Sequence, residues 1–211
     1  MPITIDEQVA ATTKPVPPQK VSFEEYLAWA LAQEHPCEWM DGEIIPVAAA
    51  SLRHQRVLSF LNFILKSFCL RHQTGQVVIA PYVMKLEAQR RGREPDLLFV
   101  SRERENLLLP TYLNGPADVA IEITSRESTG RDRGEKYVEY EAAGVREYWL
   151  IDPERQQADF YRLGDNGRYR SISPDTDGFF HSEIITGFRL RVEWLWELPD
   201  EFEVLRQLGE L

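Results

Sequence analysis

The sequence predicts an α/β (α+β) protein in which a mixed central β-sheet is flanked by helices. Apolar residues at helical spacing recur in several stretches, and between them lie short, nearly continuous apolar runs such as "DLLFV" and "VAIEI". Runs of that second kind are typical of strands that are covered on both faces. The elements follow in the order helix, hairpin, helix, strands, helix and strand, which favours a sheet with helices packed against it.

The N-terminal half begins with two capped helices around a hairpin. In "SFEEYLAWALAQE", Ser22 is a helix N-cap and Glu25 is its capping-box partner, so a helix is expected to start there. "CEWMDGEIIPVA" predicts a hairpin that turns at Asp41-Gly42, because Asp-Gly favours the tightest hairpin turns. A longer helix is expected to follow from Ser51, with a buried apolar stripe.

The second half is expected to be richer in strands. Strands are predicted in "QVVIAPYVMKLE", then, after a polar turn "AQRRGR", in "EPDLLFV" and "ADVAIEITS". A helix should run from about Thr129 to Ala143, with Gly144 as its C-terminal stop. A strand in "VREYWLIDP", an antiparallel pair over 156–163 and 167–173, and a short helix after Pro199 complete the chain.

Composition indicates how many domains the chain forms and in which cellular compartment it is expected. Residues 1–20 are proline-rich without an apolar face, so we expect a flexible leader there and a single domain over residues 21–211. The two cysteines, Cys37 and Cys69, are far apart in the sequence and have no zinc-ligand spacing, which fits a reducing compartment. No targeting pattern and no run of about 18 apolar residues is present, so a cytoplasmic protein without a membrane partner is expected.

One acidic residue interrupts a strand that is otherwise apolar. Glu122 lies in the middle of "VAIEI", where an unpaired carboxylate costs several kcal/mol of desolvation. Strand alternation sets Val119, Ile121 and Ile123 on one face, and sets Glu122 on the other with Ala120 and Thr124. Glu122 therefore needs either a partner or a ligand.

Two further residues can meet Glu122 if the fold brings their elements together. Asp96 stands at the start of "DLLFV", and neighbouring strands would bring its carboxylate close to that of Glu122. Repulsion between two such charges is relieved by a raised pKa, a basic side chain or a divalent cation. In the helix that follows, Lys136 shares one face with Asp132 and Tyr140, and so offers the basic side chain.

Several stretches taken together resemble the Uma2 family of restriction-endonuclease-like proteins, built on the PD-(D/E)XK nuclease fold. They are "CEWMDGEI", "SLRHQ", "REPDLLFV" and "DVAIEITSRESTGRDRGEKYVEYEAAGVREYWLIDP", and the resemblance covers roughly residues 21–197. It implies that Asp96 and Glu122 are the motif acids and that Glu38 is an additional N-terminal acidic residue. Thr124 stands where the family pattern has its lysine, and Lys136 is the matching lysine from the next helix.

The chemistry that this resemblance implies is metal-assisted hydrolysis of phosphodiester bonds. Mg²⁺, with Mn²⁺ as a substitute, would be held by Asp96, Glu122 and the backbone carbonyl of Ile123. Lys136 would orient or deprotonate the attacking water or stabilise charge in the transition state, and Glu38 could hold a second metal. The resemblance implies a nucleic-acid substrate, with DNA expected, and the two-fold pseudo-symmetry of DNA suggests a homodimer.

The formal net charge of −10 argues against broad adhesion to polyanions, so any phosphate contact must be local. Three further residues are candidate accessory residues of the expected catalytic site: His54, Thr124 and Ser125. Arginines near the motifs are the phosphate-binding candidates, and they include Arg93, Arg126, Arg131 and Arg133.

Each assignment has a structural alternative. Glu122 and Lys136 can form a buried ion pair, and Asp96 can cap a strand end. His54 can be a core-boundary histidine, and the arginines can be solvated surface. On the hairpin, Asp41 or Glu43 can face the site in place of Glu38. The alternative function is a catalytically weak or inactive nucleic-acid or protein interaction module on the same fold.

Overall fold

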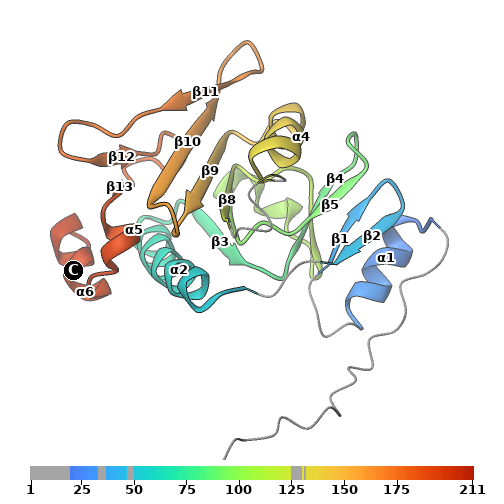
Figure 1. The fold of residues 1–211 in the computed structure, drawn as a ribbon, viewed down its shortest axis with the longest axis horizontal. Coiled ribbons are helices and arrows are strands. Elements are labelled where there is room, and N and C mark those ends of the chain that lie inside the picture. The colour runs from blue at the N-terminus through green and yellow to red at the C-terminus, as the bar shows by residue number, and fades with distance from the viewer. Residues whose placement is uncertain (1–19, 33–36, 47–49, 125–129, 131) are drawn as a thin grey trace, which may run out of the picture.

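The protein is described here by a computed structural model that covers residues 20–32, 37–46, 50–124, 130 and 132–211 (Figure 1). Thirteen strands form three sheets in the described part of the chain. The six-stranded sheet has the order β11-β10-β9-β8-β6-β3 and contains both parallel and antiparallel pairs. The five-stranded sheet has the order β2-β1-β5-β4-β7, and β12 pairs with β13. The predicted α+β class with mixed sheets is confirmed.

The described elements have the following bounds. The strands are β1 (Cys37–Met40), β2 (Glu43–Pro46), β3 (Gly75–Ile79), β4 (Val83–Leu86), β5 (Arg91–Arg93), β6 (Leu97–Ser101), β7 (Tyr112–Asn114), β8 (Val119–Ile123), β9 (Glu147–Asp152), β10 (Gln157–Leu163), β11 (Tyr169–Ile172), β12 (Phe179–His181) and β13 (Arg189–Arg191). The helices are α1 (Phe23–Ala30), α2 (Leu52–His72), η1 (Arg102–Leu107), η2 (Asp132–Lys136), α4 (Tyr137–Ala143), α5 (Trp194–Glu197) and α6 (Glu201–Leu208).

The six-stranded sheet is covered on both faces, as its apolar runs predict (Figure 1). On one face, α2 packs on the side of β8 that carries Val119, Ile121 and Ile123. On the other face, Tyr140 of α4 packs in a second core with Ala120 of β8. The strand alternation expected for β8 is therefore confirmed, and Glu122 lies on the α4 side.

The predicted caps and the hairpin are present. The Ser22 hydroxyl accepts a hydrogen bond from the Glu25 N–H at 3.2 Å, and the Glu25 carboxylate accepts one from the Ser22 N–H at 2.7 Å, which forms a capping box. The hairpin of β1 and β2 turns at Asp41 (φ 49°) and Gly42 (φ 92°), the left-handed pair that Asp-Gly favours. The second helix has Ser51 as its N-cap, and Gly144 (φ 86°) ends α4.

Three expectations of the sequence differ from the structure. "QVVIAPYVMKLE" is split at Pro81 into β3 and β4, which belong to different sheets, because proline has no N–H for a continuing ladder. The stretch "AQRRGR", predicted as a turn, contributes β5, which pairs with both β1 and β4. The helix expected from Thr129 has a π-helical turn, η2, before α4, and Thr129 itself lies outside the described residues.

Candidate active site

Glu122 and Asp96 lie on neighbouring strands at one end of the six-stranded sheet. The pairing of β6 with β8 sets Leu97 opposite Ile121, and the same register extended by one residue sets Asp96 opposite Glu122. The Glu122 residue is 4% exposed and faces the α4 side. The backbone positions of Asp96 and Glu122 are therefore neighbours, and the charge of Asp96 contributes to the raised pKa of Glu122.

Lys136 reaches Glu122 from the π-helical turn. Its Nζ lies 2.8 Å from Glu122 Oε1, 3.2 Å from Glu38 Oε1 and 3.4 Å from Asp132 Oδ1. The Tyr140 hydroxyl donates a hydrogen bond of 2.7 Å to the same Glu122 oxygen. The predicted shared face of Asp132, Lys136 and Tyr140 thus points toward Glu122.

Glu38 is the hairpin acid that faces this cluster. Its side chain is 1% exposed, and its second oxygen accepts a hydrogen bond of 2.7 Å from Arg93. The side chains of Asp41 and Glu43 are 50% and 65% exposed, and Asp41 pairs with Arg91. The structure therefore resolves the choice between the three acidic residues of the hairpin in favour of Glu38.

Asp96 is held from two sides by other groups. Its Oδ2 accepts a hydrogen bond of 2.7 Å from the Ile123 N–H, and its Oδ1 lies 3.1 Å from Nε2 of His54. His54 comes from the first turn of α2, the helix that covers the sheet face opposite Glu122. Asp96 is therefore in contact with a residue from that opposite side. A buried Nδ1 on His54 has no hydrogen-bond partner among the described residues.

The electrostatics of the cluster are dominated by burial and by an excess of carboxylates. Burial raises the pKa of Glu122 to about 8; Lys136 opposes the rise, while Asp132, Asp96 and Glu38 add to it. Burial alone would lower the pKa of Lys136, but Glu122, Glu38 and Asp132 outweigh it, so this pKa is raised. The three carboxylates therefore favour the charged form of Lys136.

Two polar groups beside the cluster lack partners in the described structure. The Thr124 hydroxyl is buried without a hydrogen bond, and so is Oε2 of Glu94. Burial and the nearby charge of Glu38 raise the pKa of Glu94 to about 7. Unsatisfied buried groups of this kind are uncommon in folded proteins and often mark functional sites.

Comparisons with known proteins place this arrangement in a family. The family model Uma2, described as "Putative restriction endonuclease", matches residues 23–193. The chain belongs to the Uma2 family. Across 153 residues it is 26% identical to the uncharacterized protein slr1290 of Synechocystis sp., covering 70% of this chain and 77% of that protein.

A solved structure supports the fold of this Uma2 protein. It is a crystal structure from Anabaena variabilis, described as a "putative nuclease belonging to DUF820". The two structures superpose with a TM-score of 0.69 at 18% identity, over 84% of this chain and 98% of that chain. At this identity the likeness establishes the shared fold.

Restriction-endonuclease-like families such as Uma2 generally use divalent metal ions. Asp96 and Glu122 offer carboxylate oxygens, the ligands that Mg²⁺ prefers. Glu122 Oε2 makes no hydrogen bond to another described residue, since both contacts of this carboxylate use Oε1. No group of three or more His, Cys, Asp or Glu in the described ranges is arranged to hold a metal. The donors fit a cation that takes few protein ligands and keeps several waters.

The expected phosphate-binding arginines of this Uma2 protein have different environments. Arg93 is 0% exposed and donates to Glu38 and Glu139, so the expected phosphate contact is contradicted by its burial. Arg133 keeps a 31% exposed side chain and pairs with Asp159 at 2.7 Å. Arg126, Arg131 and Ser125 lie outside the described residues.

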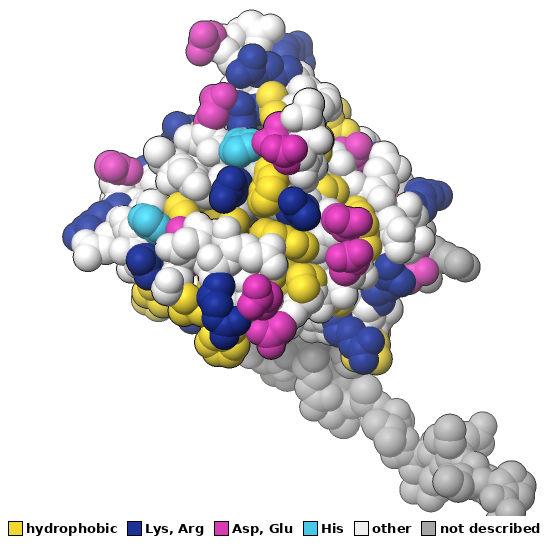
Figure 2. Space-filling view, turned by 90° about the vertical axis from the view of Figure 1, so that its left-hand side faces the viewer, with side chains coloured by type: hydrophobic (Ala, Val, Ile, Leu, Met, Phe, Trp, Pro, Cys, Tyr) yellow, Lys and Arg dark blue, Asp and Glu magenta, His cyan; other side chains and the backbone are white. Residues whose placement is uncertain are grey.

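The surface toward the C-terminal helices shows no uniform charge. Lys and Arg side chains are interspersed with Asp and Glu on this face (Figure 2).

No helix among the described residues is long and apolar enough to cross a membrane. The helical spacing placed Tyr140 on the face of Lys136 without giving it a role, and sequence reasoning missed Glu94 and Glu139.

Proposed function

We propose that this Uma2 protein is a metal-dependent endonuclease that hydrolyses phosphodiester bonds in DNA. The observation that carries the proposal is the opposition of Asp96 and Glu122 on adjacent strands, with the Lys136 ammonium 2.8 Å from Glu122. The description of the family and that of the Anabaena protein both support a nuclease. Two acids can supply oxygen ligands for a divalent ion, and one lysine can stabilise charge that develops on the phosphoryl oxygens.

In the proposed site, Asp96, Glu122 and the backbone carbonyl of Ile123 would hold the divalent ion. A bound Mg²⁺ supplies Lewis acidity and lowers the pKa of a bound water. Asp96 is oriented for this role by the Ile123 N–H and by His54, and Glu122 by Tyr140. His54 and Tyr140 are therefore positioning residues.

The contacts of Lys136 with three carboxylates favour its charged form and therefore a role other than that of a general base. Its Nζ can instead stabilise negative charge on the phosphoryl oxygens as water adds to phosphorus, and it can orient that water. Glu38 and Asp132 hold the ammonium in place.

The substrate contacts are expected to be few and local. Arg133 is the described candidate with a partly exposed side chain, and Arg126 and Arg131 remain candidates from the sequence. Because the whole chain carries a formal charge of −10, affinity for nucleic acid should depend on these few side chains, and so few phosphate contacts should give a shallow dependence of affinity on salt. DNA is favoured over RNA here only by the restriction-endonuclease description of the family.

A second candidate function is a nucleic-acid or protein interaction module without turnover. It is favoured by the contacts of Lys136 with three carboxylates, which neutralise the cluster without a metal. In that case the carboxylates form an inert buried network.

Calorimetric titration with Mg²⁺ and Mn²⁺, together with thermal unfolding in each ion, separates the two candidates. The nuclease site should bind the ion and gain thermal stability by mass action, and Glu122→Gln should abolish both effects while remaining folded. Glu43→Gln is the matched control, since it changes an exposed carboxylate of the hairpin. Wild-type protein that binds neither ion would contradict the proposal, and so would undiminished binding by Glu122→Gln.

The substrate class is tested by incubating the metal-loaded protein with labelled DNA and RNA duplexes of the same sequence. The proposal expects cleavage of DNA at a higher rate. Equal cleavage, or a preference for RNA, would contradict the DNA assignment while leaving the hydrolytic site in place.

A further inference from the structure

The outer edge of the six-stranded sheet is an open strand. β3 pairs with β6 on one side, and on its other side no strand of the described chain pairs with it. Exposed strand edges are templates for pairing, and proteins usually block them with charges, proline or bulges. Gly75–Ile79 reads "GQVVI" and contains neither a charged residue nor a proline.

The hydrogen bonds at the two ends of β3 show which backbone groups face outward. The Ala80 N–H donates to Asp96 O, and the Arg102 N–H donates to Thr74 O, both at 3.0 Å. In an antiparallel pair, residues that bond to the neighbour alternate with residues that do not. Even-numbered positions therefore bond to β6, while Gly75, Val77 and Ile79 direct their N–H and C=O groups to the open edge.

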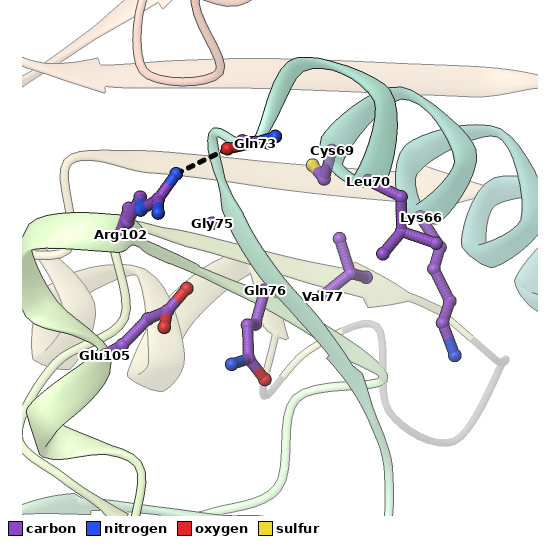
Figure 3. Close-up of a pocket in the computed structure, with 9 residues that line it drawn as sticks. All are labelled: Lys66, Cys69, Leu70, Gln73, Gly75, Gln76, Val77, Arg102 and Glu105. Carbon is purple, nitrogen blue, oxygen red and sulfur yellow. Dashed lines mark hydrogen bonds between the residues drawn. The ribbon is translucent and has the colours of Figure 1, made fainter.

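Apolar side chains lie beside these outward groups. A cavity of about 470 Å³ runs along β3, with Leu70 and Val77 toward α2. Leu70 is 70% exposed and Ile79 is 42% exposed. Figure 3 shows Lys66, Leu70 and Val77 on one side of the strand, and Gln76, Arg102 and Glu105 on the other.

We infer that β3 is a dimer interface, where it pairs antiparallel with β3 of a second copy. A two-fold axis at Val77 sets this residue opposite its own copy and sets Gly75 opposite Ile79, so that all three outward positions find partners. The side chains at these positions are complementary in size, because Gly75 of one copy faces the larger Ile79 of the other. The two six-stranded sheets would then continue into one another.

The charges along the edge fit a second copy of this chain. The two-fold axis stands perpendicular to the sheet, so equivalent sides of the two strands come together. On the η1 side each copy carries both Arg102 and Glu105, whose opposite charges can pair reciprocally across the axis. On the α2 side each copy carries the exposed Leu70, which gains apolar contact there. This inference does not rest on the proposed nuclease activity.

Light scattering coupled to size exclusion, over the micromolar range, tests the interface with the full chain. The wild type should have the mass of a dimer. Ile79→Lys places a charge on the edge, and Val77→Pro removes one outward N–H without breaking a bond to β6, so both variants should be monomeric. Val138→Lys is the matched control, because Val138 is a 62% exposed residue on α4, and it should remain dimeric.

Hydrogen exchange gives a second readout at the same backbone groups. In the wild type, the amides of Val77 and Ile79 should exchange more slowly than in Ile79→Lys. A wild-type monomer would overturn the inference, even if these amides are protected, because another segment of the chain would then cover the edge. A dimer that persists in both folded variants would also overturn it.

Discussion

The Lys136 ammonium lies 2.8 Å from a Glu122 carboxylate that is buried under α4, and it contacts Glu38 and Asp132 as well. One cation thus holds three acids at the end of the central sheet. Buried charges of this kind cost desolvation energy that only their mutual contacts offset. Removing one partner therefore leaves the other buried charges uncompensated.

Lys136→Met should destabilise the protein by about 3–5 kcal/mol, because it leaves buried carboxylates without their counter-charge. The double variant Glu122→Gln with Lys136→Met should be less destabilised than the sum of the single variants, since the residues are in contact. Urea denaturation of the four proteins in metal-free buffer measures this coupling. Additive effects would show that the pair does not interact in solution.

Glu122 should make the stability of the metal-free protein depend on pH. Its folded pKa of about 8 lies above the ordinary value of 4.5, so the folded state binds a proton more tightly than the unfolded state. The stability from this group is present below the ordinary pKa and is lost as pH rises through the folded pKa. Glu122→Gln removes this pH-dependent contribution to the free energy of unfolding.

The wild type should therefore lose stability relative to Glu122→Gln as the pH rises from about 4.5 to about 8. Denaturation of both proteins with urea at several pH values in EDTA gives the difference. A difference that does not change across this window would contradict the raised pKa.

Arg93→Lys should be strongly destabilising, by about 3–5 kcal/mol, although it conserves charge. The Arg93 guanidinium donates to Glu38 and to both oxygens of Glu139, and a lysine ammonium cannot span the two acids. Arg133→Lys, at a partly exposed site, is the control and should change stability by about 0.5 kcal/mol or less. Thermal unfolding compares them, and equal effects would argue that the Arg93 network is not structural.

Asp118 should stabilise the fold above its pKa. Burial alone would raise this pKa, but the Ser101 N–H and the Arg104 guanidinium, each 2.8 Å away, outweigh it and hold the pKa below its usual range. A lowered folded pKa gives stability that is present above the unfolded pKa and is lost as pH falls through the folded value.

Asp118→Asn should therefore cost about 1–3 kcal/mol at neutral pH, and the cost should shrink below about pH 4. The exposed Asp165→Asn is the control and should show little effect at either pH. If the cost of Asp118→Asn were the same at both pH values, the carboxylate charge would not be its cause.

Local patterns sufficed to predict the residues that share one element. Strand alternation placed Glu122 on the face opposite its apolar neighbours in the strand, helical spacing joined Asp132, Lys136 and Tyr140, and Asp-Gly placed the hairpin turn. These predictions depend on backbone periodicity, which the sequence carries directly.

Contacts between distant elements could not be predicted in the same way. Arg93 was predicted to bind phosphate because it lies near the motif residues in the sequence, yet the pairing of β5 with β1 and β4 buries it against Glu38. The contact of His54 with Asp96 joins the start of α2 to the start of β6, and no local pattern encodes it. Tertiary pairing decides both cases.

The central claim of a metal-dependent nuclease is tested most directly by cleavage of supercoiled plasmid with Mg²⁺, Mn²⁺ or EDTA. The wild type should nick or linearise the plasmid only with a divalent ion, and Asp96→Ala, with unchanged folding by circular dichroism, should not. Cleavage at an equal rate by Asp96→Ala, or cleavage by the wild type in EDTA, would contradict the proposed site.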